Sequence, residues 1–376
     1  MLHIGINGRA LFRQMTGVQH YAREVTLALG RIRPADVRLS VFAGSEGRAG
    51  AGDLPLQLST FPANGPVKGL VWEQTLLKRM IRKTGINVLF NPANVAPLNA
   101  PVPSVVTIHD LAFLLFPEYF SRTFALYYRT VVPRIAAQAA HVLTDSNSTK
   151  TDLINYLDVP EEKIAVVPLG VSPEFRRRIL KSELEEVRVR HKLPARFFLS
   201  ISSLEPRKNL GRLLEAYRLL PAEIAGEHAL VLAGAGNRIF ADSGLSKGLA
   251  AVKNGKVYIP GYIPDQDLPA IYRMSTALVF PSLYEGFGLP VLEAMSASTP
   301  VITSSRASLP EVAGHAAVQI DPESAEEIAA AMELLASDSG TRKLLIERGK
   351  KRAAGFTWET TAAQTLEVLR SAGDVP

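Results

Sequence analysis

The fold is decided by one stretch of sequence, Phe280-Pro-Ser-Leu-Tyr-Glu-Gly-Phe-Gly-Leu-Pro-Val-Leu-Glu-Ala-Met295. An apolar run ends at Phe280, a glycine-containing loop follows, and a helix is predicted to open at about Pro290, a residue suited to a first helical turn. A buried strand that feeds a glycine loop and then a helix is the repeating unit of doubly wound α/β folds. The stretch therefore predicts an α/β protein with a ligand-binding turn at this point.

The loop of this stretch has the components of an anion site. The backbone amides of Phe287, Gly288 and Leu289 stand at the opening of the predicted helix, where the helix dipole adds partial positive charge. Glu285 lies in the loop and Glu293 lies about one turn into the helix. Because a carboxylate accepts two hydroxyl hydrogen bonds at once, two carboxylates beside an anion site suit two diols joined by a diphosphate. The alternative is a strand–helix turn with two solvated glutamates.

Short apolar runs rich in β-branched residues recur along the chain, separated by helical stretches. Because the runs are almost continuously apolar, they predict parallel strands covered on both faces. In the first half we place strands at Leu2–Asn7, Arg38–Ala43, Ile86–Phe90, Ser104–Ile108, His141–Thr144 and Ile164–Pro168. In the second half we place them at Phe197–Ser202, Ala229–Ala233, Lys256–Pro260, Ala277–Phe280, Val301–Thr303 and Ala317–Ile320. Two such sets predict two Rossmann-like doubly wound sheets.

Length and composition bound the answer further. At 376 residues the chain exceeds the size at which one hydrophobic core stops growing, so we expect two domains, joined by the basic stretch 172–195. The chain has no cysteine, which excludes disulfides and thiolate metal sites. No apolar run approaches the ~20 residues that span a bilayer, and the first residues form a strand-like run rather than a basic leader. We therefore expect a cytoplasmic protein that does not cross a membrane.

The net charge of +6 favours polyanionic partners such as nucleic acid, anionic lipid or diphosphates. Residues 68–83 hold five basic side chains against one acidic, and residues 176–192 hold seven against three. Two interpretations stay open for these stretches: solvated helix faces, or a surface for anionic membrane or lipid diphosphate. Nucleic-acid binding is disfavoured because no helix-turn-helix, zinc or aromatic RNA-binding pattern is present.

Other residues with charged or titratable side chains also follow predicted strands. Arg207 and Lys208 follow the first strand of the second half, and His109 comes directly after Ser104–Ile108. Ligands of open parallel sheets bind at the carboxyl ends of the strands, so two such edges facing each other predict an active-site cleft. An adjacent Arg–Lys pair suits the neutralisation of a leaving diphosphate.

Taken together, these motifs resemble glycosyltransferase family 4, the retaining enzymes of the GT-B fold. The resemblance covers nearly the whole chain and is strongest from Gly261 to Ser305. It implies an acceptor-side Rossmann-like domain over residues 1–172 and a nucleotide-sugar-binding domain over residues 190–356, facing across a cleft. It also implies that a helix over about residues 357–376 crosses back onto the first domain.

The resemblance assigns roles to the residues of the second domain. The family's pair of glutamates matches Glu285 and Glu293, which implies that Glu285 contacts the donor sugar and Glu293 the ribose. The amides of Phe287, Gly288 and Leu289 are implied to hold the sugar and diphosphate. The segment 202–209 resembles the family's phosphate grip, with Arg207 and Lys208 as its cations. Tyr262 and Ile263 resemble the segment that contacts the nucleotide base.

Two further roles fall in the first domain. His109 stands where the family has a histidine near the donor sugar, and Asp110 either orients His109 or caps the next helix. The segment 13–22, with its glycine Gly17, resembles the flexible loop that closes over the diphosphate after the first strand. The residues predicted to be catalytic are therefore His109, Arg207, Lys208 and Glu285.

No catalytic metal and no other cofactor is expected. Asp265-Gln266-Asp267 has the spacing of the metal-binding motif of another glycosyltransferase fold. Because it precedes the helical run Leu268–Met274, helix N-capping explains it better. No carboxylate nucleophile is identifiable, so we expect front-face attack in which the leaving phosphate takes the acceptor's proton.

The expected donor and acceptor come from the resemblance alone. The opening segment, the Trp72-Glu73-Gln74 helix and Asn91-Pro92-Ala93-Asn94 look most like bacterial mannosyltransferases of polysaccharide assembly. This implies transfer of mannose from GDP-mannose to a saccharide or a polyprenyl-diphosphate-linked saccharide, with peripheral contact at the inner membrane face. Alternatives are a glucosyl or N-acetylglucosaminyl transferase that uses a UDP-sugar, or a nucleotide-sugar epimerase on the same fold.

Overall fold

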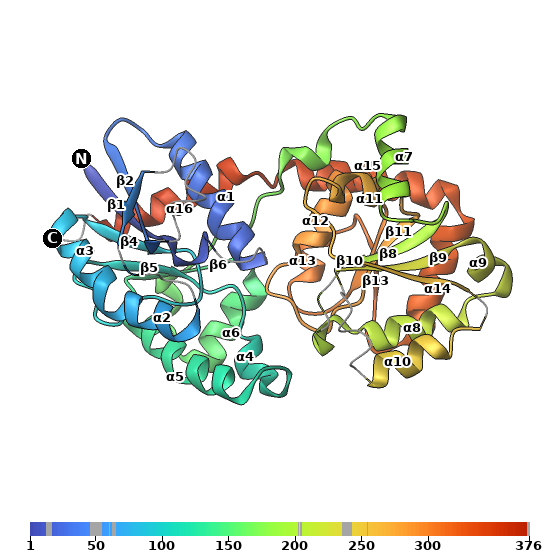
Figure 1. The fold of residues 1–376 in the computed structure, drawn as a ribbon, viewed down its shortest axis with the longest axis horizontal. Coiled ribbons are helices and arrows are strands. Elements are labelled where there is room, and N and C mark those ends of the chain that lie inside the picture. The colour runs from blue at the N-terminus through green and yellow to red at the C-terminus, as the bar shows by residue number, and fades with distance from the viewer. Residues whose placement is uncertain are drawn as a thin grey trace. The chain divides into compact units, whose positions relative to one another are not determined.

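The computed structural model describes residues 1–12, 17–45, 55–59, 61, 65–201, 203, 205–234, 243–253 and 255–373. The chain divides into two compact units (Figure 1). Unit 1 comprises residues Met1–Gly170 together with Thr357–Pro376, and unit 2 comprises Val171–Phe356. Each unit is built around its own parallel sheet.

The described part of unit 1 forms a seven-stranded sheet with the order β3-β2-β1-β4-β5-β6-β7. Its strands are β1 (Leu2–Asn7), β2 (Val37–Ala43), β3 (Leu56–Leu58), β4 (Val88–Asn91), β5 (Ser104–Thr107), β6 (His141–Thr144) and β7 (Ile164–Val166). Every neighbouring pair is parallel. All six residues of β1 are buried, as expected of a central strand covered on both faces.

Helices cover the faces of this sheet and connect its strands. They are α1 (Gly17–Ile32), α2 (Pro66–Val71), α3 (Lys78–Thr84), α4 (Ala112–Leu115), α5 (Arg122–Gln138), α6 (Asn147–Leu157) and α16 (Trp358–Gly373), with a π-helical turn over Trp72–Leu77. The last helix, α16, packs against α1 although more than 300 residues separate them in sequence. The amino- and carboxy-terminal parts of the chain therefore share one core.

The described part of unit 2 forms a six-stranded parallel sheet with the order β10-β9-β8-β11-β12-β13. Its strands are β8 (Phe197–Ile201), β9 (Ala229–Ala233), β10 (Val257–Gly261), β11 (Ala277–Phe280), β12 (Val301–Ser304) and β13 (Val318–Ile320). Its helices are α7 (Lys181–Arg190), α8 (Leu210–Leu219), α9 (Ala222–Glu227), α10 (Ser243–Ala250), α11 (Leu268–Met274), α12 (Leu289–Ser296), α13 (Leu309–Ala313), α14 (Ala325–Ser337) and α15 (Ser339–Ala354).

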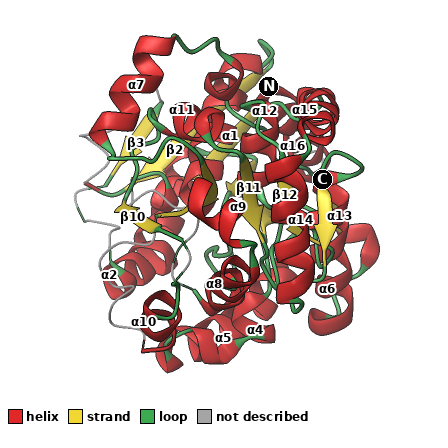
Figure 2. Cartoon of the chain, turned by 90° about the vertical axis from the view of Figure 1, so that its right-hand side faces the viewer, coloured by secondary structure: helices red, strands yellow, loops and turns green. Residues whose placement is uncertain are grey.

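The core of unit 2 lies between its sheet and the helices that flank it (Figure 2). Phe198 and Leu232 from the strands pack with Leu214 of α8 and Met332 of α14, and all four are buried. Burial of one such side chain contributes about 1.5–3 kcal/mol relative to exposure. The core holds the strands in place and so determines where their carboxyl ends lie.

The predicted fold class, two Rossmann-like parallel-sheet domains, is confirmed. Each predicted strand is present, with ends that differ by at most two residues. The short strand β3 was not predicted, because its three residues lack a sustained apolar run. The stretch 172–195, interpreted as a linker, instead contains a 3-10 turn over Pro173–Arg176 and the helix α7, which packs against α11 within unit 2.

Candidate active site

The two cations predicted to grip phosphate lie just beyond the carboxyl end of β8. Arg207 and Lys208 belong to a 3-10 turn over Pro206–Lys208, which ends at Asn209 in the left-handed conformation with φ 60°. The side-chain amide of Asn209 donates to the carbonyl of Pro281 at 3.1 Å and to that of Pro322 at 2.6 Å. Because these carbonyls follow β11 and β13, Asn209 ties the turn to the same edge of the sheet. Ser202 and Leu204 lie outside the described residues.

The loop that follows β11 is hydrogen-bonded to this 3-10 turn. The amide of Leu283 donates to the carbonyl of Arg207 at 2.8 Å. The hydroxyl of Ser308 donates to the carbonyls of Glu285 at 2.9 Å and Phe287 at 2.8 Å. Gly288 has φ 110°, and a Cβ there would lie 2.5 Å from Leu309 Cδ2, so only glycine fits. These contacts define the backbone path that leads into α12.

Glu285 lies between the two cations. Its Oε1 is 2.6 Å from Lys208 Nζ and its Oε2 is 2.9 Å from Arg207 Nη1, and its side chain is 8% exposed. Burial alone would raise the pKa of Glu285, but Lys208 and Arg207 outweigh burial and lower it. Glu285 is therefore ionised at neutral pH. The structure thus brings Glu285 into contact with two cations that lie about 77 positions earlier in the sequence.

A second carboxylate, that of Glu205, also contacts Arg207. Glu205 Oε2 accepts from Arg207 Nε at 2.6 Å, and the Ser203 hydroxyl donates to its Oε1 at 2.7 Å. Glu205 and Glu285 together match the charges of Arg207 and Lys208. The charges of the two cations are therefore balanced within this cluster. A diphosphate that binds here would have to share or replace these carboxylate contacts.

The opening of α12 follows this ion cluster directly. Leu289 is its first residue, Gly288 is its N-cap and Pro290 lies in its first turn, as predicted. The first amides of a helix have no acceptor within that helix, so this end can receive an anion. Glu293 is half-buried on the next turn, and its Oε2 accepts from the hydroxyl of Tyr272 at 2.8 Å. The two glutamates and the helix opening thus belong to one continuous segment.

The two residues predicted to contact the nucleotide base, Tyr262 and Ile263, differ in their exposure to solvent. Both follow β10, whose last residue is Gly261 with φ 80°. Tyr262 is 68% exposed, whereas Ile263 is 4% exposed and packs inside unit 2. In the sheet order, β8 and β9 lie between β10 and β11, which carries the Glu285 loop. Only Tyr262 of the two presents a side chain to solvent.

The helix N-cap predicted for Asp265-Gln266-Asp267 is present in position but lacks the expected side-chain hydrogen bond. Asp267 occupies the N-cap position of α11, but its side chain makes no capping hydrogen bond. Its carboxylate instead contacts Arg190 Nη1 at 2.8 Å and His191 Nε2 at 2.7 Å, which ties α11 to α7. Among the described residues, no group of three or more His, Cys, Asp or Glu side chains is placed to hold a metal ion.

In unit 1, His109 follows β5 and is held by Asp145, which the sequence did not single out. His109 Nδ1 lies 2.7 Å from Asp145 Oδ2, and both side chains are buried. Of the two roles left open for Asp110, the structure favours the cap, because its Oδ1 accepts from the amide of Ala112 at 3.0 Å at the start of α4. The signal that could have found Asp145 is its place directly after the predicted strand His141–Thr144.

A second cluster of polar side chains, which was not predicted from the sequence, lies at the same carboxyl-terminal edge of the unit 1 sheet. Glu73 is fully buried in the π-helical turn and accepts from Asn7 Nδ2 at 2.8 Å and Arg9 Nη1 at 2.9 Å. Asn7 also donates to Asn91 Oδ1 at 3.0 Å, which links the ends of β1 and β4. Because π-helical turns are rare and concentrate at functional sites, this segment joins the candidate site of unit 1.

The prediction that Gly17 lies in a loop was wrong, because Gly17 is the first residue of α1. It is exposed, and a Cβ at this position would meet no atom within 4 Å. Residues 13–16 of the segment predicted to close over the diphosphate lie outside the described residues. The expected role of this segment therefore stays a prediction.

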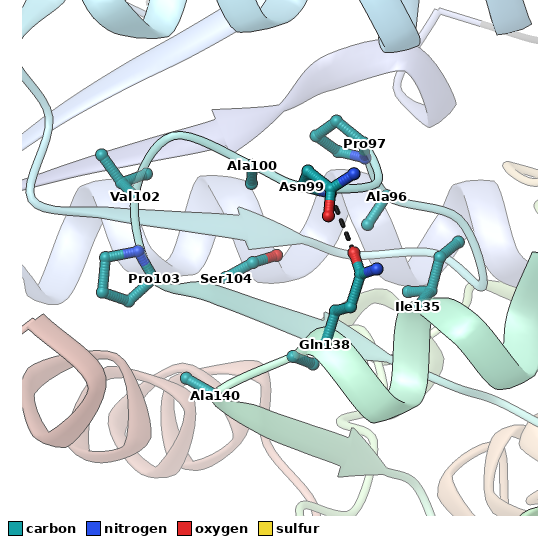
Figure 3. Close-up of a pocket in the computed structure, with 11 residues that line it drawn as sticks. Ala96, Pro97, Asn99, Ala100, Val102, Pro103, Ser104, Ile135, Gln138 and Ala140 are labelled. Carbon is teal, nitrogen blue, oxygen red and sulfur yellow. Dashed lines mark hydrogen bonds between the residues drawn. The ribbon is translucent and has the colours of Figure 1, made fainter.

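A cavity of about 400 Å³ opens at the opposite edge of the unit 1 sheet (Figure 3). It lies between the segment that leads into β5 and the carboxy-terminal end of α5. The backbone amide of Asn99 donates to Gln138 Oε1 at 2.8 Å across the cavity. No charged side chain lines this cavity, and it lies at the amino end of β5, away from His109. It offers no group for acid–base or phosphate chemistry.

Two doubly wound units, the second carrying its ion cluster where a helix opens, place the chain in the GT-B class of glycosyltransferases. Residues 15–175 match the family model described as Glycosyltransferase Family 4, and residues 182–352 match the model of group 1 glycosyl transferases. The chain is 34% identical over 269 residues to the O-antigen chain mannosyltransferase B of Escherichia coli, with 71% of this chain and 70% of that relative covered. The chain therefore belongs to glycosyltransferase family 4.

Other relatives differ in length or are more distant. The serotype-specific mannosyltransferase WbdA of Escherichia coli is 31% identical over 280 residues, but the chain covers only 33% of that longer protein. Among solved structures, Anabaena HepE in complex with UDP-glucose superposes with a TM-score of 0.76 at 18% identity, with 99% of this chain and 100% of that chain covered. At that identity the likeness concerns the fold alone.

Proposed function

We propose that this glycosyltransferase moves mannose from GDP-mannose to a saccharide acceptor during bacterial polysaccharide assembly. The support is twofold. Relatives above 30% identity are named as mannosyltransferases, among them an O-antigen chain mannosyltransferase, and unit 2 holds Glu285 between Arg207 and Lys208 beside the opening of α12. This ion cluster is the observation on which the proposal depends. A nucleoside diphosphate sugar combines the anionic and hydroxyl groups that such a cluster binds.

In the proposed reaction, the two cations stabilise the negative charge that develops on the leaving diphosphate. Arg207 offers a planar fork of donors and Lys208 a compact charge, so the pair follows the oxygens as the glycosidic bond lengthens. The first amides of α12 add partial positive charge at the same place. Once diphosphate oxygens contact the cations, Glu285 is free to accept hydroxyl hydrogen bonds from the donor sugar. Glu293 serves the ribose in the same way.

We further propose that the anomeric configuration is retained by attack on the face from which the diphosphate leaves. The acceptor oxygen forms its bond to the anomeric carbon while the bond to the diphosphate oxygen breaks. The acceptor's proton passes to that phosphate oxygen, which balances the charge without a protein nucleophile. Proton NMR of the mannosylated product, whose new glycosidic bond does not mutarotate, distinguishes retention from inversion.

The donor is tested by presenting the enzyme with GDP-mannose, UDP-glucose, UDP-N-acetylglucosamine and ADP-glucose in thermal-shift and transfer assays. We expect stabilisation and transfer with GDP-mannose above the others. A preference for a UDP-sugar would move the assignment to a glucosyl or N-acetylglucosaminyl transferase. Rearrangement of the donor without an acceptor would identify an epimerase. Neither stabilisation nor turnover with any nucleotide sugar would contradict the proposal as a whole.

Membrane contact is a further part of the proposal, and the two basic stretches differ in their support for it. In the stretch 176–192, Arg177, Arg188 and Arg190 pair with Glu183, Glu185 and Asp267, which favours the interpretation as a solvated, self-paired face. In the described part of unit 1, by contrast, no ion pair is formed by Lys68, Lys78, Arg79, Arg82 or Lys83. Basic side chains that form no ion pair with the described residues suit contact with an anionic membrane.

Exposed apolar side chains accompany the unpaired cations, since Val67 is 71% and Val71 46% exposed on α2. We therefore propose that the surface over residues 67–83 contacts an anionic bilayer from the cytoplasmic side, where a lipid-linked acceptor would be presented. No helix among the described residues is long and apolar enough to cross a membrane. Cosedimentation with phosphatidylglycerol vesicles, but not with phosphatidylcholine vesicles, is the expected result.

The matched variants exchange basic residues for serine in one stretch at a time. Replacing Arg79, Arg82 and Lys83 should weaken vesicle binding by about 100-fold, because each basic residue near such a surface contributes about 1 kcal/mol. Replacing Arg178, Lys181 and Lys192 in the other stretch, which removes the same number of charges, should leave it unchanged. Equal losses in both variants would show a response to net charge alone.

A further inference from the structure

The pairing of His109 with Asp145 follows from the register of the unit 1 sheet. β5 and β6 are parallel, with Thr107 opposite Leu143. Two further residues along each strand, the same register sets His109 opposite Asp145. His109 Nδ1 and Asp145 Oδ2 are 2.7 Å apart, and the two residues are 7% and 3% exposed. A buried carboxylate therefore faces the imidazole from the neighbouring strand.

The other ring nitrogen of His109 faces a second acceptor. Nε2 lies 3.4 Å from the carbonyl oxygen of Pro92, which follows β4 on the other side of β5. A backbone carbonyl can only accept a hydrogen bond, and so can an ionised carboxylate. A neutral imidazole has one N–H, so one of its nitrogens would present a lone pair to an oxygen. Only the imidazolium ion donates in both directions.

Neighbouring groups prevent the ring from turning away from these acceptors. The His109 amide donates to Asn94 Oδ1 at 2.9 Å, and the hydroxyl of Thr149 donates to the His109 carbonyl at 3.3 Å. The ring of Tyr21 on α1 packs edge-on against the imidazole, with ring centroids 4.7 Å apart. The hydroxyl of Tyr21 lies 3.1 Å from Thr107 Oγ1. The orientation of the imidazole is thus fixed from α1, α6 and the β4–β5 connection.

The charged groups that face the His109 ring favour its protonated form. Asp145 is the nearest, Asp110 is next along the chain, and Tyr21 stays neutral because burial raises the pKa of its phenol. Burial alone would lower the pKa of His109. The Asp145 carboxylate and the Pro92 carbonyl outweigh burial and raise it. No cation among the described groups is near enough to oppose them.

We propose that Asp145 is a positioning residue that holds His109 as a fixed imidazolium, so that His109 serves sugar transfer as a charged hydrogen-bond donor and not as a base. The function of His109 in transfer rests on the proposed function, whereas its charge state does not. The 3.4 Å contact with Pro92 is long for a hydrogen bond. A hydroxyl or phosphate oxygen of the donor can therefore replace the carbonyl at Nε2, while Asp145 keeps the ring in place.

The charge state is tested by NMR of the full chain labelled with ¹⁵N-histidine, with the His109 signals assigned from their loss in His109→Gln. In the wild type we expect both ring nitrogens of His109 to be protonated at about pH 7. Asp145→Asn keeps the shape and an acceptor but removes the charge, and should lower the pKa of His109 by about one unit, a tenfold change in its equilibrium constant. Asp110→Asn, which removes a neighbouring charge that does not touch the ring, should shift it less.

Transfer kinetics supply the second readout. Because protonation is restored in acid, Asp145→Asn should lose about tenfold in kcat/KM at about pH 8 and recover most of it at about pH 6. A loss independent of pH would assign Asp145 a purely structural role and overturn the proposal. A neutral His109 in the wild type at about pH 7 would overturn it even if the variant failed to fold. If the wild type transferred no sugar, the proposed function would fail while the NMR titration still decided the charge state.

Discussion

The hydroxyl of Tyr272 donates a 2.8 Å hydrogen bond to Oε2 of Glu293. Tyr272 is fully buried in α11, and burial together with the nearby Glu293 raises the pKa of its phenol. The phenol therefore remains a donor at all ordinary pH values. A residue of the packed interior thus holds one oxygen of the carboxylate that we propose binds the ribose. Core packing and donor binding are coupled at this point.

Replacing Tyr272 with phenylalanine tests this coupling. The variant keeps the ring but removes the buried hydrogen bond from Tyr272 to Glu293, which should lower the free energy of unfolding by about 1–3 kcal/mol. The KM for the donor should rise several-fold while kcat changes little, because the contact serves binding before the reaction begins. Urea denaturation and initial-rate kinetics measure the two effects. A variant with lowered kcat and unchanged KM would contradict the ribose role of Glu293.

Glu285→Gln should reduce transfer by about 100-fold or more, because an interaction with the reacting sugar is lost. The fold should persist, since glutamine fills the same volume between Arg207 and Lys208, and circular dichroism can verify this. Glu205→Gln is the matched control, because Glu205 contacts the same guanidinium but has a more exposed side chain. It should cost less than tenfold. Equal losses in both variants would show that only the charge balance around Arg207 matters.

Asp267 should make stability depend on pH. Burial would raise the pKa of Asp267, but its hydrogen bonds to His191 and Arg190 outweigh burial and lower it. A lowered folded-state pKa stabilises the protein above the unfolded value of about 3.9 and loses this effect as pH falls through the lower folded value. Asp267→Asn should therefore unfold more easily at about pH 7, and its deficit relative to the wild type should shrink as the pH falls below about 3.9. A deficit that stays equal over this range would exclude the ion pair as its cause.

Gly170→Ala should destabilise the chain through a backbone clash. A Cβ at Gly170 would lie 2.3 Å from the amide nitrogen of Trp358 and 2.5 Å from the carbonyl carbon of Thr357. Neither is a flexible side chain, so the strain should cost about 1–3 kcal/mol. Gly30→Ala, in helix α1 with no atom within 4 Å of its Cβ position, should instead stabilise by about 0.5–1 kcal/mol. Chemical denaturation of both variants separates the clash from the general effect of adding a methyl group.

The strands could be predicted because their signal is local. A run such as Ala229–Ala233 is apolar throughout, as burial on both faces of a parallel sheet requires. The strand Leu56–Leu58 was missed because three residues are too few to form a pattern. A helix start at about Pro290 was predicted for the same local reason, since proline suits a first helical turn, and α12 begins one residue earlier at Leu289.

Side-chain partners could be predicted only where a family pattern supplied them. Arg207, Lys208 and Glu285 were expected to serve one site, but the direct contact of Glu285 with both cations was not predicted. The sequence did not indicate which residues would pair with His109 and Asp267. Asp145 and His191 lie 36 and 76 positions away from them, and only strand register and helix packing bring each pair together.

By itself, the sequence determined the two parallel sheets, the positions of the reactive residues at strand ends and the family to which these motifs point. These properties depend on hydrophobic periodicity and on backbone preferences, which act over a few neighbouring residues. Only the tertiary structure decided that Asp145 faces His109, that Asp267 joins two helices and that Glu285 neutralises its cations. Hydrogen bonds and ion pairs form between atoms about 3 Å apart, and only the folded chain brings distant residues that close.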